Sequence, residues 1–204
     1  MTLSEFDNEI RKDHNVVCGC DEAGRGPLAG DVFAAAVIFD KDTVIEGIND
    51  SKKLTAKKRE ELFDEIIEKA VDFSIQTATV EEIEDINILN AAMLAMKRAV
   101  EDMDTKPDVC LIDGNKTPEG LECPAIAVVK GDAKSQAVAA ASILAKVARD
   151  RYMEQMAEQY PEYQFEKHKG YGTKLHYQMI DQYGPCGIHR MSFLKKYYAK
   201  KNGN

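Results

Sequence analysis

The 204-residue sequence lacks the features of a membrane or secreted protein. No apolar run approaches the ~20 residues needed to cross a bilayer. Residues 1–15 are polar and include acids, so they have neither the apolar segment of a signal peptide nor the basic amphipathic pattern of a transit peptide. We therefore expect a cytoplasmic location. The length suits one large domain with a small appendage.

Motifs of several other protein classes are also absent. The five cysteines are scattered and no Cys-x-x-Cys occurs, so neither a zinc site nor a disulfide framework is predicted. There is no Gly-x-x-x-x-Gly-Lys-Ser/Thr, which argues against an ATP-driven motor. Gly24-x-Gly26 begins like a dinucleotide fingerprint, but Pro27 follows it and the next element is predicted to be a strand. The glycines instead suit close approach of main-chain groups to a ligand such as a sugar hydroxyl.

A net positive charge is missing as well, since the chain carries −8. A generic nucleic-acid-binding protein would be basic. The charge is uneven, however, because residues 163–204 hold eight Lys or Arg against two acids, and six of the eight tyrosines. Cations interleaved with aromatic rings suit a polyanion whose bases stack. A solvated C-terminal face is the alternative, and charge alone favours it slightly.

The most informative feature that is present is a pair of acids, Asp21 and Glu22, between an apolar run and a glycine-rich stretch. The run, residues 16–20, is short and indicates a buried strand. Neighbouring residues of a strand point to opposite faces, so the pair would present one acid on each side. Ionised acids resist burial without compensation, which favours a bound divalent metal ion. An acidic surface turn is the alternative.

Further strands are predicted to bring acids to the same region. Residues 31–40 form an apolar strand that is expected to pair with the first as an antiparallel hairpin. Residues 109–112 and 125–129 are followed closely by Asp113 and Asp132. The segments between these runs favour a mixed sheet with parallel members. Ligands collect at the carboxyl ends of strands in such a sheet.

Helices are predicted over residues 56–70, around the apolar stripe of residues 89–103, and over residues 133–160. The alanine-rich face of the last helix is expected to lie against the sheet. Its opposite face is predicted to carry a stripe of hydroxyls and cations: Ser135, Ser142, Lys146 and Arg149. Asp132 could alternatively cap this helix. Smaller helical pieces are expected after Pro161.

Four carboxylates, Asp21, Glu22, Asp113 and Asp132, have no histidine or cysteine in their immediate motifs. Ligation by oxygen alone favours Mg²⁺ or Mn²⁺ over zinc. Two such ions about 3.5 to 4 Å apart can activate a water and stabilise the leaving oxygen of a phosphodiester. The set therefore predicts a metal-dependent phosphodiesterase, although any one of these acids could instead cap a turn.

Longer blocks of the sequence resemble ribonuclease HII, a type 2 ribonuclease H family. In order along nearly the whole chain, they are 21–30 (DEAGRGPLAG), 50–54 (DSKKL), 111–114 (LIDG), 131–133 (GDA), 139–150 (AAASILAKVARD), 168–173 (HKGYGT) and 188–190 (IHR). The resemblance implies an α/β, ribonuclease H-like fold: a five-stranded mixed sheet flanked by helices. Residues 1–160 would form the catalytic domain, and residues 161–204 a small helical subdomain that binds substrate.

The same resemblance implies an endoribonuclease that uses Mg²⁺ or Mn²⁺, with two ions in the substrate complex. It would hydrolyse the RNA strand of RNA–DNA hybrids and cut at ribonucleotides embedded in duplex DNA, leaving 5'-phosphate and 3'-hydroxyl ends. The family's catalytic metal ligands correspond to Asp21, Glu22, Asp113 and Asp132. Its substrate contacts at the 2'-hydroxyl and the neighbouring nucleotide correspond to Gly24, Arg25, Gly26 and Tyr171. The 2'-hydroxyl is what distinguishes RNA from DNA locally.

The remaining substrate-binding candidates are basic side chains that could contact phosphate: Lys52, Lys53, Lys146, Arg149, Lys169 and Arg190. The histidines are expected to satisfy local hydrogen bonds instead of acting as acids or bases. Asp31 stands where the family commonly has proline, and we expect it to loosen that turn. No glutamine follows Gln182, so the sliding-clamp peptide of some archaeal relatives is not predicted despite Tyr197 and Tyr198. We expect a monomer.

Two other functions compete with this interpretation. One is another metal nuclease of the same fold, such as a junction resolvase, which would cut a branched DNA junction and not a duplex with one ribonucleotide. The other is a module that binds hybrids without catalysis. Replacing Asp21 or Asp113 with Asn separates the second alternative, since only an enzyme would lose turnover.

Overall fold

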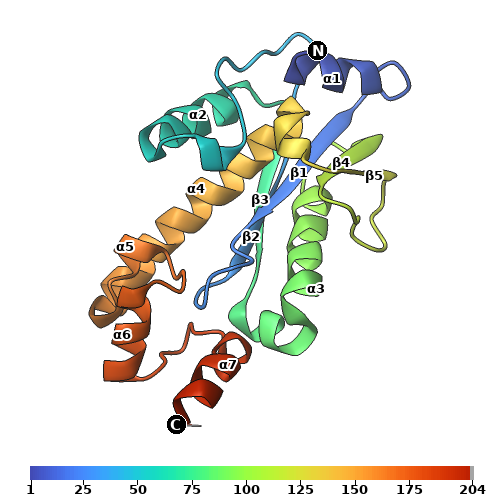
Figure 1. The fold of residues 1–204 in the computed structure, drawn as a ribbon. Coiled ribbons are helices and arrows are strands. Elements are labelled where there is room, and N and C mark those ends of the chain that lie inside the picture. The colour runs from blue at the N-terminus through green and yellow to red at the C-terminus, as the bar shows by residue number, and fades with distance from the viewer. Residues whose placement is uncertain (203–204) are drawn as a thin grey trace.

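The computed structural model describes residues 1–202 and shows a central sheet with helices on both faces (Figure 1). The strands are β1 (Val17–Ala23), β2 (Val32–Ile38), β3 (Asp72–Ala78), β4 (Val109–Asp113) and β5 (Ala125–Val128). They lie in the order β3-β2-β1-β4-β5. The pairs β1–β2 and β2–β3 are antiparallel, whereas β1–β4 and β4–β5 are parallel. The predicted five-stranded mixed sheet is confirmed.

The helices are α1 (Leu3–Ile10), α2 (Ala56–Lys69), α3 (Val80–Glu101), α4 (Gln136–Gln159), α5 (Phe165–His168), α6 (Lys174–Tyr183) and α7 (Met191–Asn202). Short 3₁₀ turns are η1 (Ser51–Lys53), η2 (Gly131–Ala133) and η3 (Pro161–Tyr163). The sequence analysis missed α1, whose start is marked by a capping box between Thr2 and Glu5. None of the helices in the described part of the chain is both long and apolar enough to span a membrane.

Helix α4 lies very close to β1, as its alanine-rich face predicts. A Cβ added to Gly19 would be 2.2 Å from the carbonyl carbon of Ala137, so only glycine fits at this point of the strand. Ala140, Ala141 and Leu144 are fully buried in the same layer. Helix α3 covers the opposite face of the sheet, where Ala91, Ala95 and Ala99 belong to a second apolar core (Figure 1). Small residues thus let both layers approach the sheet closely.

The predicted polar stripe on α4 is not a solvated face. Ser135, Ser142 and Arg149 are all buried. Ser142 lies against Ser51 of η1, and Arg149 is enclosed by the loop after β1 and by Lys169. Ser135 is the N-cap of α4, and its hydroxyl accepts the N–H of Val138. The alternative in which Asp132 caps this helix is therefore wrong, and Asp132 instead lies in η2.

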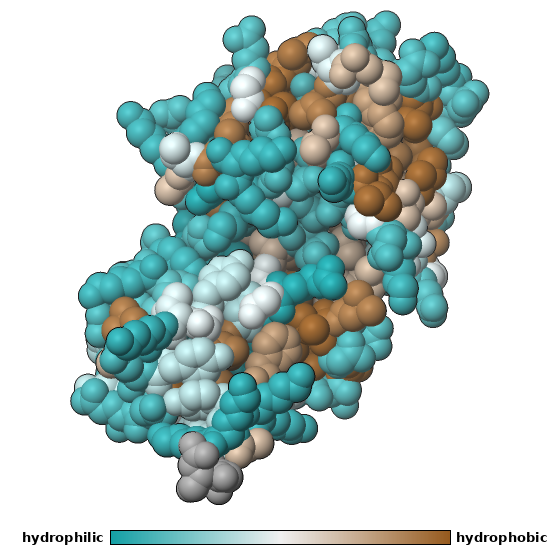
Figure 2. Space-filling view, in the orientation of Figure 1, coloured by the Kyte–Doolittle hydropathy of each residue, from teal (hydrophilic) through white to brown (hydrophobic). Residues whose placement is uncertain are grey.

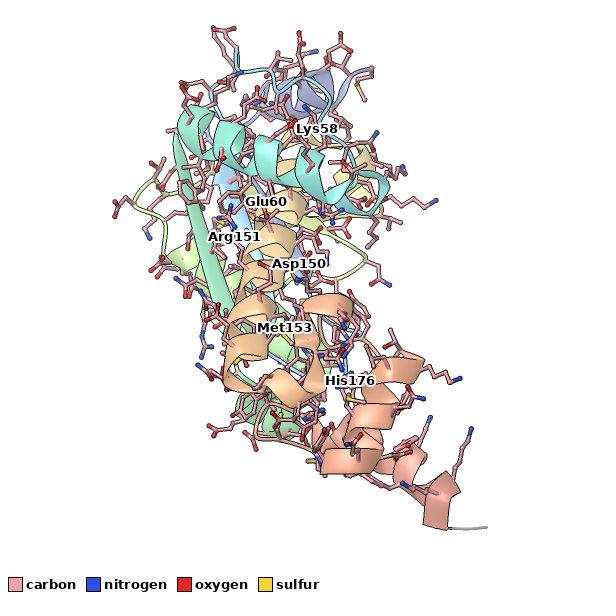
Figure 3. All side chains as sticks on the ribbon, turned by 90° about the vertical axis from the view of Figure 1, so that its left-hand side faces the viewer. Lys58, Glu60, Asp150, Arg151, Met153 and His176 are labelled. Carbon is pink, nitrogen blue, oxygen red and sulfur yellow. The ribbon has the colours of Figure 1, made fainter. Side chains whose placement is uncertain are left out.

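The C-terminal segment runs from η3 to α7; its first part, η3 and α5, packs against the far end of α4, whereas Ser192 of α7 bonds to Glu84 of α3 (Figure 1). Met153 of α4 and His176 of α6 both lie in the region where these elements meet (Figure 3), and both side chains are fully buried. Arg151, on another face of α4, donates to the carboxylate of Glu60 in α2. The long helix α4 therefore connects the sheet, α2 and the C-terminal segment.

Candidate active site at the carboxyl ends of the strands

Three acids, at the ends of β1 and β4 and in the turn η2 after β5, meet at one edge of the sheet. In the parallel register of β1 and β4, Cys20 is opposite Ile112, so the next residues, Asp21 and Asp113, are neighbours. Asp113 pairs in turn with Val128 of β5. The chain then enters η2, where the N–H of Gly131 donates to Asp113 Oδ1 at 2.6 Å. This bond fixes the turn that carries the third acid beside the other two.

The acids at this edge repel one another. Burial raises the pKa of Asp21 well above its usual range, and the charges of Glu22 and Asp113 raise it further. Burial also raises the pKa of Asp132, with additional contributions from Asp113 and Asp50. Carboxylates gathered in this way, and offering only oxygen atoms, suit a hard divalent cation. The residues present therefore fit Mg²⁺ or Mn²⁺ in their chemistry.

The side chains are turned onto protein groups in this structure. Glu22 Oε1 lies 3.2 Å from Arg25 Nη1, and Asp21 Oδ1 accepts the N–H of Glu22 at 2.7 Å. Asp113 Oδ1 is engaged by Gly131. Within residues 1–202, no three His, Cys, Asp or Glu side chains converge closely enough to hold a metal ion as they stand. The backbone brings the acids together, but their side chains point to neighbouring protein groups and not to a common centre.

A fifth acid and two serines at this edge were not among the predicted site residues. Asp50 lies beside Asp132 and hydrogen-bonds with it, which contributes to the raised pKa of Asp132. Ser51 and Ser142 are buried, with their hydroxyl oxygens 3.0 Å apart. Ser142 also lies beside Asp21, and hydrogen bonding by its hydroxyl favours the charged form of that carboxyl. The DSKKL block of the sequence was the available signal for Asp50 and Ser51.

A groove of about 310 Å³ opens beside the acids. It is lined by Glu22, Ala23, Gly24, Arg25, Gly26, Ser51, Lys52, Ser142, Lys146 and Tyr171. The Tyr171 side chain is 43% exposed, and a Cβ on Gly26 would be 3.7 Å from its ring. In Figure 2 the molecule narrows between the part that contains α2 and the part that contains the C-terminal helices. Predicted substrate residues from four distant sequence blocks thus share one surface.

The four candidate lysines are placed differently. Lys52 is exposed at the groove, and Lys146 Nζ lies 5.9 Å from the centre of the Tyr171 ring while pairing with Asp150. Among residues 1–202, those that line the groove do not include Lys53 or Lys169. Their ammonium groups lie near Asp50 and Glu154, respectively. Lys52 and Lys146 are therefore the better placed cations for a phosphate in the groove.

The two candidate arginines are buried and do not present their charge to solvent. Arg149 is 1% exposed and donates to the carbonyls of Ala29, Asp31 and Lys169. Arg190 is 0% exposed and also donates to main-chain carbonyls. Both guanidinium groups are engaged by main-chain carbonyls in this structure, and their direct contact with phosphate stays a prediction. Both guanidinium groups hold the loop between β1 and β2.

Asp31 fastens its turn, contrary to the expectation that it would loosen it. Its Oδ1 accepts the N–H of Val80, the first residue of α3, at 2.9 Å. Burial raises the pKa of Asp31, while this hydrogen bond and the nearby Arg190 and Arg149 favour its charged form. A carboxylate at the start of a helix also interacts favourably with the helix dipole. The turn after the glycine-rich loop is thereby tied to α3.

The three C-terminal histidines satisfy local hydrogen bonds, as predicted. His176 Nδ1 is 3.0 Å from the carbonyl oxygen of Tyr171, so this nitrogen carries the proton. His176 Nε2 consequently accepts from His189 Nε2, 3.0 Å away. His189 Nδ1 then accepts the N–H of Cys186, and His168 is bonded to the Tyr163 carbonyl. Each ring is neutral, because one of its nitrogens donates a hydrogen bond and the other accepts one.

Comparisons with known proteins agree with this site. A family profile described as Ribonuclease HII matches residues 18–196. Ribonuclease HII of Caldicellulosiruptor saccharolyticus is 54% identical over 189 residues, which cover 93% of this chain and 92% of that protein.

Solved structures show the same fold. Ribonuclease H2 from Pyrococcus horikoshii superposes with a TM-score of 0.72 at 30% identity, over 87% of this chain and 93% of the other. The ribonuclease HII of Archaeoglobus fulgidus, solved in a complex with PCNA, gives 0.67 at 25% identity, over 86% and 94%. The chain therefore belongs to the ribonuclease HII family, whose members are metal-dependent hydrolases that cleave the RNA strand of RNA–DNA hybrids.

Proposed function

We propose that this ribonuclease cuts at single ribonucleotides embedded in duplex DNA as well as within RNA–DNA hybrids, with two divalent ions held by Asp21, Glu22, Asp113 and Asp132. The observation that carries the proposal is the groove itself. It brings Glu22 and the glycine-rich segment 24–26 together with the exposed ring of Tyr171. Acids for chemistry and groups suited to a ribose and a base are thus within one small cavity.

When bound, Mg²⁺ or Mn²⁺ would stabilise the attacking and leaving oxygens of the phosphodiester. The protein's own groups orient the substrate around that centre. Lys52 and Lys146 attract the phosphates on either side of the cavity. Ser142 keeps the Asp21 carboxylate in a fixed direction through its hydroxyl. Tyr171 packs on the nucleotide next to the ribose, since its exposed ring lies directly beside Gly26.

The decisive experiment is cleavage of a duplex that contains one internal ribonucleotide. We expect a single cut that leaves 5'-phosphate and 3'-hydroxyl ends, is stopped by a chelator, and is restored by excess Mg²⁺ or Mn²⁺. A matched all-DNA duplex and an all-DNA branched junction serve as controls and should stay intact. Cleavage of the junction without cleavage of the ribonucleotide-containing duplex would instead identify a junction resolvase.

Replacement of Asp113 by Asn tests the metal site. Because Asp113 lies between Asp21 and Asp132, we expect turnover to fall by more than the roughly 10–100-fold that loss of an outer-shell partner of a metal ligand costs. Binding of a hybrid, measured by fluorescence anisotropy, should persist. Glu122→Gln removes an exposed acid from the loop before β5 and is the matched control. Retained turnover in Asp113→Asn would rule out this site.

Replacement of Tyr171 by Ala tests the proposed contact with the nucleotide. Stacking on an aromatic ring contributes about 1–3 kcal/mol per base, so we expect kcat/KM at an isolated ribonucleotide to fall about tenfold or more. Tyr183→Ala is the matched control, because that ring is 51% exposed in the same segment but does not line the groove. An unchanged rate in Tyr171→Ala would remove this residue from the site.

We also propose that the protein acts as a monomer without a clamp peptide at residues 197–198. Tyr197 packs on Tyr177, with ring centres 4.6 Å apart, and Tyr198 packs on Tyr197 at 5.6 Å. These rings are therefore engaged within the C-terminal segment. Light scattering would check the oligomeric state, and an assay with a purified clamp would check the second point. A clamp complex lost on Tyr197→Ala would contradict it.

A further inference from the structure

The loop that connects β1 to β2 is held from beneath by one buried side chain. Arg190 Nη2 donates to the Gly24 carbonyl at 2.7 Å, and Nη1 donates to the carbonyls of Pro27 at 2.9 Å and Arg25 at 3.3 Å. Its Nε donates to the Gly30 carbonyl at 2.8 Å. Four carbonyls of the loop, residues 24–31, therefore converge on a single guanidinium. This contact pattern determines which way the peptide groups of the loop face.

Two of those peptide groups border the groove. The Gly24 carbonyl belongs to the same peptide as the Arg25 N–H, and the Arg25 carbonyl to the same peptide as the Gly26 N–H. No cis peptide occurs in the described chain, so each N–H points opposite to its carbonyl and away from Arg190. Among residues 1–202, neither N–H donates to another protein group. Both are available as donors at a wall of the cavity that also holds Tyr171.

The main chain around Arg190 fixes the guanidinium in place. The N–H of Arg190 donates to the Leu28 carbonyl, and the N–H of Gly30 donates to the Ile188 carbonyl, both at 2.8 Å. Ala29 and His189 form the antiparallel bridge between these contacts. The side chain is also covered by the ring of Phe193, 5.3 Å from its central carbon. Arg190 thus approaches the loop from a rigid strand-like segment.

Arg190 remains a cation at neutral pH, although its burial and the nearby Arg149 lower its pKa to about 9. A charge-assisted hydrogen bond is stronger than a neutral one, so the carbonyls are held firmly. The positive charge beneath the loop also favours electron-rich oxygen atoms above it. The Arg25 and Gly26 N–H groups thus form a preorganised pair of donors. The Arg190 cation supports ligand binding by them without contacting the ligand.

We infer that Arg190 is a positioning residue that sets ribose recognition: it holds the Gly24 and Arg25 carbonyls inward so that the Arg25 and Gly26 N–H groups face the 2'-hydroxyl of the substrate. This inference rests on the proposed function and adds the residue that orients its ribose-binding amides. Arg190 never contacts substrate. A site built to hydrogen-bond a hydroxyl rejects a substrate without one, because its donors then lose their partner.

The test compares Arg190→Met with the wild type in two measurements. The first is kcat/KM on a duplex with one ribonucleotide, and the second is the inhibition constant of the identical all-DNA duplex as a competitor. We expect kcat/KM to fall about tenfold or more, while the inhibition constant changes by less than about twofold. The inhibition constant is independent of the fraction of folded enzyme, so it separates lost discrimination from lost protein. Arg190→Lys should give an intermediate rate.

Arg98→Met is the matched control. Arg98 also bonds a main-chain carbonyl, that of Thr77, and forms a two-pronged pair with Glu82, but it does not line the groove. Its loss should lower the melting temperature and leave kcat/KM per folded enzyme unchanged. A folded Arg190→Met variant with wild-type kcat/KM would overturn the inference.

A measurement on the wild type covers the case in which Arg190→Met does not fold. In metal-free buffer with a chelator, the amide resonances of Arg25 and Gly26 should shift with the ribonucleotide-containing duplex more than with the all-DNA duplex. Equal shifts would overturn the inference. If the wild type cut neither hybrids nor ribonucleotide-containing duplexes, the proposed function itself would fail. Normal cutting with equal amide shifts would refute the inferred ribose contact of these amides and leave the proposed cleavage activity standing.

Discussion

The interior of the sheet region is stabilised by apolar packing, whereas the C-terminal segment also depends on buried polar groups. Between α4 and the sheet, contacts are made by alanine, leucine and isoleucine, and Gly19 permits the closest approach. Between the C-terminal segment and the loop after β1, apolar contacts of Leu28 and Ala29 are accompanied by hydrogen bonds from the buried guanidinium group of Arg190 and from that of Arg149 in α4. The segment's own interior contains the hydrogen-bonded rings of His176 and His189. The proposed metal ligands therefore stand on an apolar scaffold, whereas the proposed ribose contact also depends on buried polar groups.

This difference predicts which substitutions and which changes in pH each region tolerates. Apolar packing responds to side-chain volume and depends little on pH. A buried polar network responds to protonation and to the loss of any single partner, because a group left unpaired in the interior costs free energy. Changes in volume should therefore damage the sheet most, and changes in proton count should damage the C-terminal segment most.

The largest expected effect on stability is that of Gly19→Ala. The added methyl would lie 2.2 Å and 2.3 Å from main-chain atoms of Ala137 and Val138, so α4 must move away from β1. We expect the free energy of unfolding to fall by about 3 kcal/mol, as measured by urea denaturation. Gly187→Ala is the control, since its methyl would meet only the Tyr160 hydroxyl at 3.6 Å. Equal stabilities of the two variants would contradict the close packing.

Acid should weaken the C-terminal segment before the sheet. Burial lowers the pKa values of His176 and His189 to about 4, whereas an unfolded histidine titrates near 6.5. Between these values the unfolded chain binds more protons than the folded one, so stability is full above pH 6.5 and is lost as the pH falls toward 4. The loss of stability can be measured locally as a fall in the hydrogen-exchange protection of the α6 amides between pH 7 and pH 4.5.

The stability contributed by Asp7 changes with pH in the opposite direction to that of the histidines. Burial raises its pKa, so protonation relieves a cost of folding and acid favours this part of α1. Faster exchange in α1 than in α6 on acidification would contradict the assignment of acid sensitivity to the histidines. A double variant, His176→Gln with His189→Gln, should show a flatter dependence of α6 exchange on pH.

The smallest expected effect is that of Asp31→Ala, at the boundary of the two regions. It removes the acceptor for the Val80 N–H at the start of α3 and leaves Arg149 and Arg190 in place. We expect a loss of about 1 kcal/mol in the free energy of unfolding, comparable to the loss of a helix cap. Asp31→Asn keeps an acceptor oxygen and should lose less. A more stable Asp31→Ala variant would show that the buried charge outweighs its hydrogen bond.

Most of the sheet could be predicted from the sequence, because period-two and apolar patterns report directly on burial. The strand ends placed Asp21 and Asp113 correctly beside each other, since parallel strands share an edge. The predicted metal ligands and substrate contacts remain predictions until they are measured. The burial of Ser142 and Arg149 could not be predicted, because helical period alone does not say that a turn or loop will cover a polar face.

The polar network was beyond sequence reasoning for a physical reason. Basic residues are solvated in most proteins, and nothing in the local sequence of Arg190 shows that carbonyls from a loop 160–166 positions earlier will surround it. Asp50 was overlooked because its neighbours, Lys52 and Lys53, suggested an ordinary polar loop. Only the folded chain shows that this loop returns to Asp132.

The separation of 166 positions between Gly24 and Arg190 has a consequence for biogenesis. Contacts between remote parts of a chain form late, because they must wait for the intervening polypeptide and for closure of a very large loop. During synthesis the acidic edge can assemble while residue 190 is still inside the ribosome. A nascent or prematurely ended product would thus possess the proposed metal ligands before it possesses Arg190, the residue proposed to orient the ribose contact.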